Sequence, residues 1–140
     1  MIKFDNVKKT FRRTEVLTGL NLDIEKGDRI ALVGSNGAGK TTMIRCLLGE
    51  YTFAGKVLVN GKNPRNDRQT VLQNIGFVPQ LPPPLKMPVG QLINFSASLC
   101  NADPQQMIHV AERLGLEIEQ LRSRPFVKLS GGQKQKILIS

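Results

Sequence analysis

The first eighty residues carry short apolar segments of the kind that form β-strands. Apolar and polar positions alternate at residues 2–7 and again at 20–24, which predicts two half-buried strands. Residues 29–33 form a short apolar run with a charge at its start, as in a buried parallel strand. Residues 56–59 form another apolar run, which ends in the Asn-Gly turn signal at 60–61. These segments predict the sheet of an α/β domain.

Helical spacing appears after the third of these segments. The apolar residues that share one helix face there are Met43, Ile44, Leu47 and Leu48. Gly49 is placed to end that helix. Residues 62–74 are polar and predict a connecting loop with room for a short helix, and residues 75–78 form a compact apolar strand.

The composition changes at Leu81. Prolines at 82–84 and at 88 interrupt helix and sheet, so they predict a stiff, exposed connector. The pattern then becomes helical, with one shared face formed by Leu92, Phe95, Ser96 and Leu99. Asp103 and Pro104 predict the N-cap and first position of the next helix. Its apolar stripe contains Met107, Val110, Ala111 and Leu114. We therefore expect an α/β core at residues 1–80 and a small helical subdomain at residues 81–140.

Composition and charge narrow the function only slightly. The chain of 140 residues has 20 Lys and Arg against 11 Asp and Glu, a net charge of +9 that suits anionic partners such as nucleotide, RNA or an acidic membrane surface. This positive charge is weak evidence, because a chain from which an acidic segment is missing would also be basic. No apolar run approaches the roughly 18 residues of a membrane span. Cys46 and Cys100 are isolated and read as reduced packing residues of a cytosolic protein.

The strongest chemical motif lies between the predicted strand at 29–33 and the helix after it. It is formed by Gly34, Ser35, Asn36, Gly37, Ala38, Gly39, Lys40, Thr41 and Thr42, and it reads G-x-x-x-x-G-K-[ST]. Such a P-loop turns backbone N–H groups toward phosphate oxygens, and the helix N-terminus adds a favourable field. We expect Lys40 to reach the β- and γ-phosphates of a nucleotide and the Thr41 hydroxyl to ligate Mg²⁺. The alternative is a glycine-rich turn before an ordinary helix.

A second motif carries a resemblance to a known family. Alone, Leu129-Ser130-Gly131-Gly132-Gln133 is a loop or a helix start. Together with the P-loop, it makes the chain resemble the nucleotide-binding domains of ATP-binding cassette (ABC) proteins. Residues 34–41 match the Walker A motif, 129–133 the signature motif, and Gln80 the Q-loop glutamine. Phe11 matches the aromatic that stacks on adenine, although the family usually has Tyr there.

The resemblance implies a head-to-tail pair of ATP-binding domains. In it, the Lys40 site of one domain is closed by the signature of the other, through Ser130, Gly131, Gly132 and Gln133. Gln80 would bind Mg²⁺ or the attacking water, and so is a candidate catalytic residue with Lys40 and a candidate metal ligand with Thr41. Two alternatives stay open: Gln80 as a plain surface glutamine and Phe11 as a plain core residue. The lone His109 is expected to be structural or exposed.

The expected function is that of the ATP-binding subunit of an ABC transporter, an ATPase that uses ATP and Mg²⁺. The resemblance implies a separate transmembrane permease, a location at the inner, cytoplasmic face of the membrane, and no nucleic-acid partner. The segment at 75–80 with its proline-rich turn looks most like ATPases of bacterial exporters, which favours export. The alternatives are a soluble ABC ATPase acting on ribosomes or DNA, and an inactive nucleotide-binding fragment.

One departure from the family pattern concerns the catalytic machinery. The Walker B strand, its glutamate and the switch histidine should follow the signature helix, but residues 1–140 contain no apolar run that ends in Asp-Glu. We therefore expect the chain to be the N-terminal part of the domain, truncated before Walker B. We expect it to bind ATP weakly and not to hydrolyse it alone, and to leave exposed the sheet edges that a missing central strand would cover.

Overall fold

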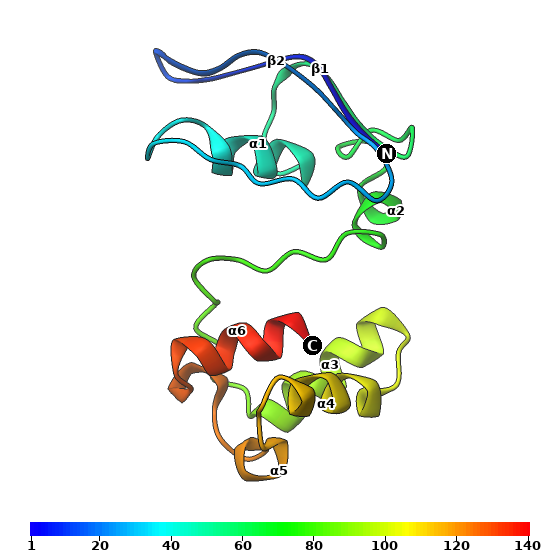
Figure 1. The fold of residues 1–140 in the computed structure, drawn as a ribbon, viewed down its shortest axis with the longest axis vertical. Helices are drawn as coiled ribbons and strands as arrows, with labels where there is room; N and C mark the ends of the chain where they lie inside the picture. The colour runs from blue at the N-terminus through cyan, green and yellow to red at the C-terminus, as the bar shows by residue number, and fades with distance from the viewer. The chain divides into compact units, whose positions relative to one another are not determined.

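The computed structural model describes residues 1–140 and divides into two compact units, Met1–Gly76 and Phe77–Ser140 (Figure 1). The first unit contains β1 (Ile2–Phe11), β2 (Thr14–Ile24), α1 (Lys40–Leu47), β3 (Ala54–Val59) and α2 (Arg68–Leu72). The second contains α3 (Val89–Cys100), α4 (Pro104–Arg113), α5 (Ile118–Leu121), the 3-10 helix η1 (Phe126–Lys128) and α6 (Gly131–Ile139). The first unit therefore ends at residue 76, whereas the sequence predicts that the α/β core ends at residue 80.

The sheet of the first unit is antiparallel and three-stranded, in the order β2-β1-β3. Its alternating positions bury one face, as the sequence predicts. That face packs with α1 into a core formed by Phe4, Val7, Leu17, Met43, Cys46 and Val57. Burial raises the pKa of the Cys46 thiol, and the Lys9 ammonium partly opposes that rise.

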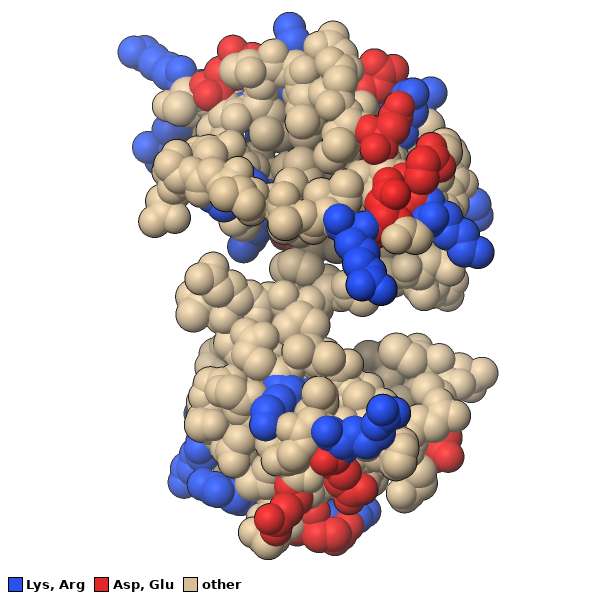
Figure 2. Space-filling view, viewed as in Figure 1, with Lys and Arg blue, Asp and Glu red and all other residues tan.

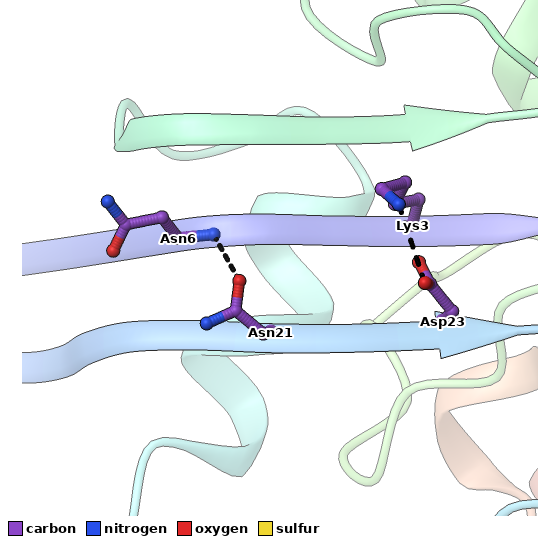
Figure 3. A network of polar contacts seen from close by, with 4 residues as sticks. All are labelled: Lys3, Asn6, Asn21 and Asp23. Carbon is purple, nitrogen blue, oxygen red and sulfur yellow. Dashed lines mark hydrogen bonds and ion pairs between the residues drawn. The ribbon is translucent and has the colours of Figure 1, made fainter.

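A bulge at Asn6 shapes the sheet (Figure 3). Asn6 has a left-handed φ of 47°, and its N–H donates to the Asn21 side-chain oxygen at 2.8 Å. Across the strand pair, Gly55 on β3 has a φ of 86°, and a Cβ there would lie 2.3 Å from the Asn6 carbonyl oxygen. Near the start of β1, Lys3 forms an exposed ion pair with Asp23 on β2 at 3.4 Å. An exposed pair of this kind contributes little stability.

The strands predicted at residues 29–33 and 75–78 do not form. Both segments are irregular, and neither has a neighbouring strand in the described chain. A strand needs a partner for its backbone N–H and C=O groups, whereas an apolar run shows only that a segment is suited to burial. Most of their apolar side chains remain exposed, and Val33 shows 92% of its surface.

The helices of the second unit surround their own apolar core. It is formed by Val89, Leu92, Ile93, Ala111, Leu116, Ile118, Leu121, Phe126, Leu129 and Ile137. The proline-rich connector is exposed at Leu81, but Leu85 packs against this core. Backbone hydrogen bonds hold the same stretch: Phe126 N–H donates to the Met87 carbonyl at 2.9 Å. The connector is therefore only partly the free segment that its prolines predict.

The buried face of α3 only partly coincides with the face that the helical spacing groups together. The residues that it buries are Val89, Leu92, Ile93 and Ala97. Phe95 and Leu99, which the spacing groups with Leu92, are 51% and 70% exposed. Apolar residues occupy both sides of this helix, so their spacing alone does not select a face; contact with α4 and α5 does.

The predicted cap of α4 is confirmed, since Gln105 N–H donates to the Asp103 carboxylate at 2.9 Å. No helix of the structure is both long enough and apolar enough to span a membrane.

Candidate functional site

The P-loop glycines fit their positions for steric reasons. Gly39 is the N-cap of α1 and has a left-handed φ of 90°. A Cβ at Gly39 would lie 3.0 Å from the Leu17 side chain and 3.1 Å from the Val16 carbonyl oxygen, both on β2. Gly37 is also left-handed, with φ 87°. The loop thus passes close against β2 before α1 begins. A residue with a side chain at Gly37 or Gly39 would be strained in this backbone conformation.

The start of α1 presents unpaired backbone donors. Its first intrahelical bond runs from Met43 N–H to the Gly39 carbonyl at 2.8 Å, so the amides of Lys40, Thr41 and Thr42 precede the bonded part of the helix. The first turn contains no acidic residue. Three free N–H groups and the positive end of the helix dipole fit the negative oxygens of a phosphate chain.

The Lys40 side chain folds back over the loop. Its ammonium donates to the Gly34 carbonyl at 2.6 Å and to the Ser35 carbonyl at 2.7 Å. Ala38 N–H donates to the same Ser35 carbonyl at 3.2 Å and tightens the turn. The cation is thereby held at the loop beside the free amides, while Thr41 is exposed. The structure brings together the predicted phosphate-binding residues, 34–42, within the first unit.

Phe11 lies at the exposed end of β1. The strand that the sequence predicts at residues 2–7 continues to Phe11, which pairs with Thr14 on β2. Its side chain is 38% exposed, so it is not a core residue. An aromatic ring at this position remains available to a ligand.

The signature motif forms the N-terminus of α6 through a capping box. The Ser130 hydroxyl accepts from Gln133 N–H at 3.2 Å, and the Gln133 side-chain oxygen accepts from Ser130 N–H at 3.1 Å. Between them, Gly131 and Gly132 are exposed, and a Cβ at either would meet nothing within 4 Å. Neither glycine has a positive φ. Nothing within the second unit therefore requires glycine at these two positions.

Gln80 is exposed, and its backbone carbonyl accepts a hydrogen bond from Gln135, a residue that no sequence pattern singles out. The Gln135 amide on α6 donates to the carbonyls of Pro79 and Gln80, at 3.2 and 3.3 Å. The Q-loop segment is thereby tied to the signature helix within the second unit. Lys40 and Thr41 belong to the first unit, so the grouping of Gln80 with them stays a prediction. His109 is exposed on α4.

Comparison with known sequences decides the family. The sequence model of the ABC transporter family matches residues 17–140, which include the P-loop, the Q-loop and the signature motif. The chain belongs to the ABC transporter family.

Relatives and solved structures agree with this assignment. The sulfate/thiosulfate import ATP-binding protein CysA of Nephroselmis olivacea is 32% identical, over 99% of this chain and 41% of its own length. The structure of cbiO1 from Clostridium perfringens, part of the ABC transporter complex cbiONQ, matches with a TM-score of 0.77 and 27% identity, over 99% of this chain and 59% of its own. A bacterial Atm1-family ABC exporter with ATP bound matches at 0.83 and 28%, over 99% and 26%. The fold is therefore that of an ABC ATP-binding domain, and this ABC chain spans about two fifths of the length of the curated relative.

Proposed function

We propose that this chain forms the ATP-binding part of an ABC transporter subunit and that the complete protein hydrolyses ATP to drive transport. One observation carries the proposal: the loop at residues 34–39 delivers the Lys40 ammonium and three free amides to the N-terminus of α1. That arrangement binds a chain of phosphates and has no other evident use.

Each residue of the loop has a distinct task in holding the nucleotide. Lys40 exchanges the carbonyl oxygens of Gly34 and Ser35 for β- and γ-phosphate oxygens. The amides of residues 40–42 donate to the same phosphates, and the exposed Thr41 hydroxyl orients Mg²⁺. Mg²⁺ supplies neutralising charge between the phosphates when it is bound. Gln80 is assigned the positioning of water or metal.

The signature surface supports a second ATP-binding domain as partner. Gly131 and Gly132 occupy the first two positions of α6 without a steric or conformational reason inside their own unit. Close approach by another molecule supplies the reason, and the N-terminus of α6 suits an anionic one. We assign this surface to the nucleotide of the partner domain in a head-to-tail dimer.

The partner and the direction of transport rest on the relatives. The CysA relative is named as an import protein, and the cbiO1 structure is described as part of a transporter complex. The first name supports import over the export that the sequence pattern favours, and the second description supports assembly with membrane subunits. An exporter also matches. A permease partner would place the subunit at the cytoplasmic face of the membrane.

On the face shown in Figure 2, the charge distribution gives no support to the alternative of an ABC ATPase acting on RNA or DNA. Figure 2 shows Lys and Arg side chains at separate places on each unit, with Asp and Glu side chains beside several of them. Binding to a nucleic-acid backbone usually uses a continuous basic face. On the face shown, the Lys and Arg side chains do not form such a continuous basic face.

Phosphate release tests the proposed function. Purified complete protein should release phosphate from MgATP, and Lys40→Ala should abolish that release. Residues 1–140 alone should release none, because the first turn of α1 has no carboxylate. Glu50 lies beyond the far end of this eight-residue helix, about 12 Å along its axis. An inactive complete protein, or release from either protein that survives Lys40→Ala, would contradict the proposal.

A further inference from the structure

Phe11 does not stand alone at the end of β1. Its ring meets that of Tyr51 edge-on, with centroids 5.1 Å apart and an interplanar angle of 80°. This is a favoured aromatic geometry, worth more than the area that it buries. Tyr51 lies in the connection between α1 and β3 and also packs against the core of the first unit. It can therefore fix an exposed ring to a buried support.

Two cations complete the contact. The Lys9 ammonium lies 4.7 Å from the Phe11 ring centroid and 5.5 Å from that of Tyr51. The Arg45 guanidinium on α1 lies 5.6 Å from the Tyr51 centroid and donates to its hydroxyl at 3.3 Å. Arg45 is also within 3.7 Å of the Glu50 carboxylate. Tyr51 is thus tied both to the hairpin and to the helix that follows the P-loop.

The hairpin that carries Phe11 also borders the phosphate site. Two residues after its partner Thr14, β2 reaches Val16, whose carbonyl lies 3.1 Å from the Cβ position of Gly39. The tip of the hairpin and the P-loop lie at the same end of the first unit (Figure 1). A nucleotide whose phosphates bind at α1 would therefore extend its base toward this end of the hairpin.

We propose that Tyr51 is a positioning residue for the nucleotide base: it holds the Phe11 ring in the orientation on which the base stacks. The inference rests on the proposed ATP-binding function. A ring already fixed by Tyr51 and Lys9 loses little freedom when a base stacks on it, whereas an unsupported ring must be ordered on binding. Arg45 carries the same constraint to α1, so the base and phosphate ends of the site share one support.

Calorimetric titrations of the complete protein with ATP and with inorganic tripolyphosphate, which has no base, test the proposal. Tyr51→Leu keeps apolar packing and should weaken ATP binding about three- to tenfold. It should leave tripolyphosphate binding unchanged. Tyr51→Phe keeps the ring and should restore most of the ATP affinity. Phe11→Ala combined with Tyr51→Leu should be no weaker than Phe11→Ala alone, because Tyr51 acts through Phe11.

Several results would overturn the inference. They are unchanged ATP affinity in Tyr51→Leu, an equal loss for tripolyphosphate, and additive losses in the double variant. If Tyr51→Leu fails to fold, Tyr51→Phe and Phe11→Ala still decide: a Tyr51→Phe loss as large as that of Phe11→Ala would contradict a role for the ring. Lys40→Ala should weaken both ligands and serves as the control. Wild-type protein that binds neither ligand would instead overturn the proposed function.

Discussion

Replacement of Lys40 by alanine should weaken ATP binding by about 10- to 150-fold, because a charge-assisted contact of this kind contributes roughly 1.5–3 kcal/mol. The Lys40 ammonium is the cation that the structure holds at the P-loop, on the carbonyls of Gly34 and Ser35. Alanine leaves the free amides of α1 in place but removes the charge that the β- and γ-phosphates require. Titration with a fluorescent ATP analogue measures the loss.

Two further variants separate loss of charge from loss of structure. Lys40→Met keeps the apolar stem and should weaken binding as strongly as alanine. Lys26→Ala removes an exposed lysine from the turn after β2 and should leave the affinity unchanged. If Lys40→Ala bound the analogue as wild type does, the assignment of residues 34–42 as a phosphate site would be wrong.

Introduction of arginine at Ser130 should block ATP-driven dimerisation of the complete protein and leave ATP binding by the single domain nearly intact. Ser130 caps α6 beside the two open glycines, on the surface that we assign to the nucleotide of the partner domain. A long cationic side chain would fill the space that this nucleotide needs. Light scattering with ATP, in the absence of Mg²⁺ to prevent turnover, reports the change in mass.

The capping box complicates this variant, so it needs a matched control. Replacement of an N-cap serine by alanine costs about 0.5–2 kcal/mol of stability, and arginine likewise lacks the oxygen that accepts the Gln133 N–H. Ser130→Ala removes the cap without adding bulk, so it should show the same loss in thermal unfolding but retain some ATP-dependent dimer. Normal dimerisation by Ser130→Arg would refute the head-to-tail arrangement.

Local patterns in the sequence predict the parts of the fold that depend on near neighbours. Alternation predicts the first part of β1 and the last part of β2, and the apolar run before the turn at 60–61 predicts β3. The Asp103-Pro104 pair predicts the start of α4. These features rest on contacts within an element or on one buried face. The segment at residues 29–33 fails as a strand because its state depends on a neighbour that no local pattern supplies.

The same distinction applies to the site. The P-loop is predictable because its residues are consecutive and the glycines, the lysine and the helix start all belong to one motif. The Gln135 side chain donates to the Pro79 carbonyl, 56 positions away in the sequence. The Tyr51 ring, in the connection between α1 and β3, contacts the Phe11 ring on β1. A glutamine in a helix and a tyrosine two residues after a helix-ending glycine carry no local signal of such contacts. The fold alone brings them to the site.

Backbone amide shifts during a titration with MgATP test the central claim, binding of phosphate at the start of α1, most directly. NMR detects weak binding, and the isotope-labelled chain of 15.5 kDa suits the method. The account predicts that the largest shifts arise at Gly37, Gly39, Lys40, Thr41 and Thr42, where the left-handed glycines and free amides lie. The account would be contradicted if millimolar ATP caused no shifts, or if the largest shifts arose at amides other than these five.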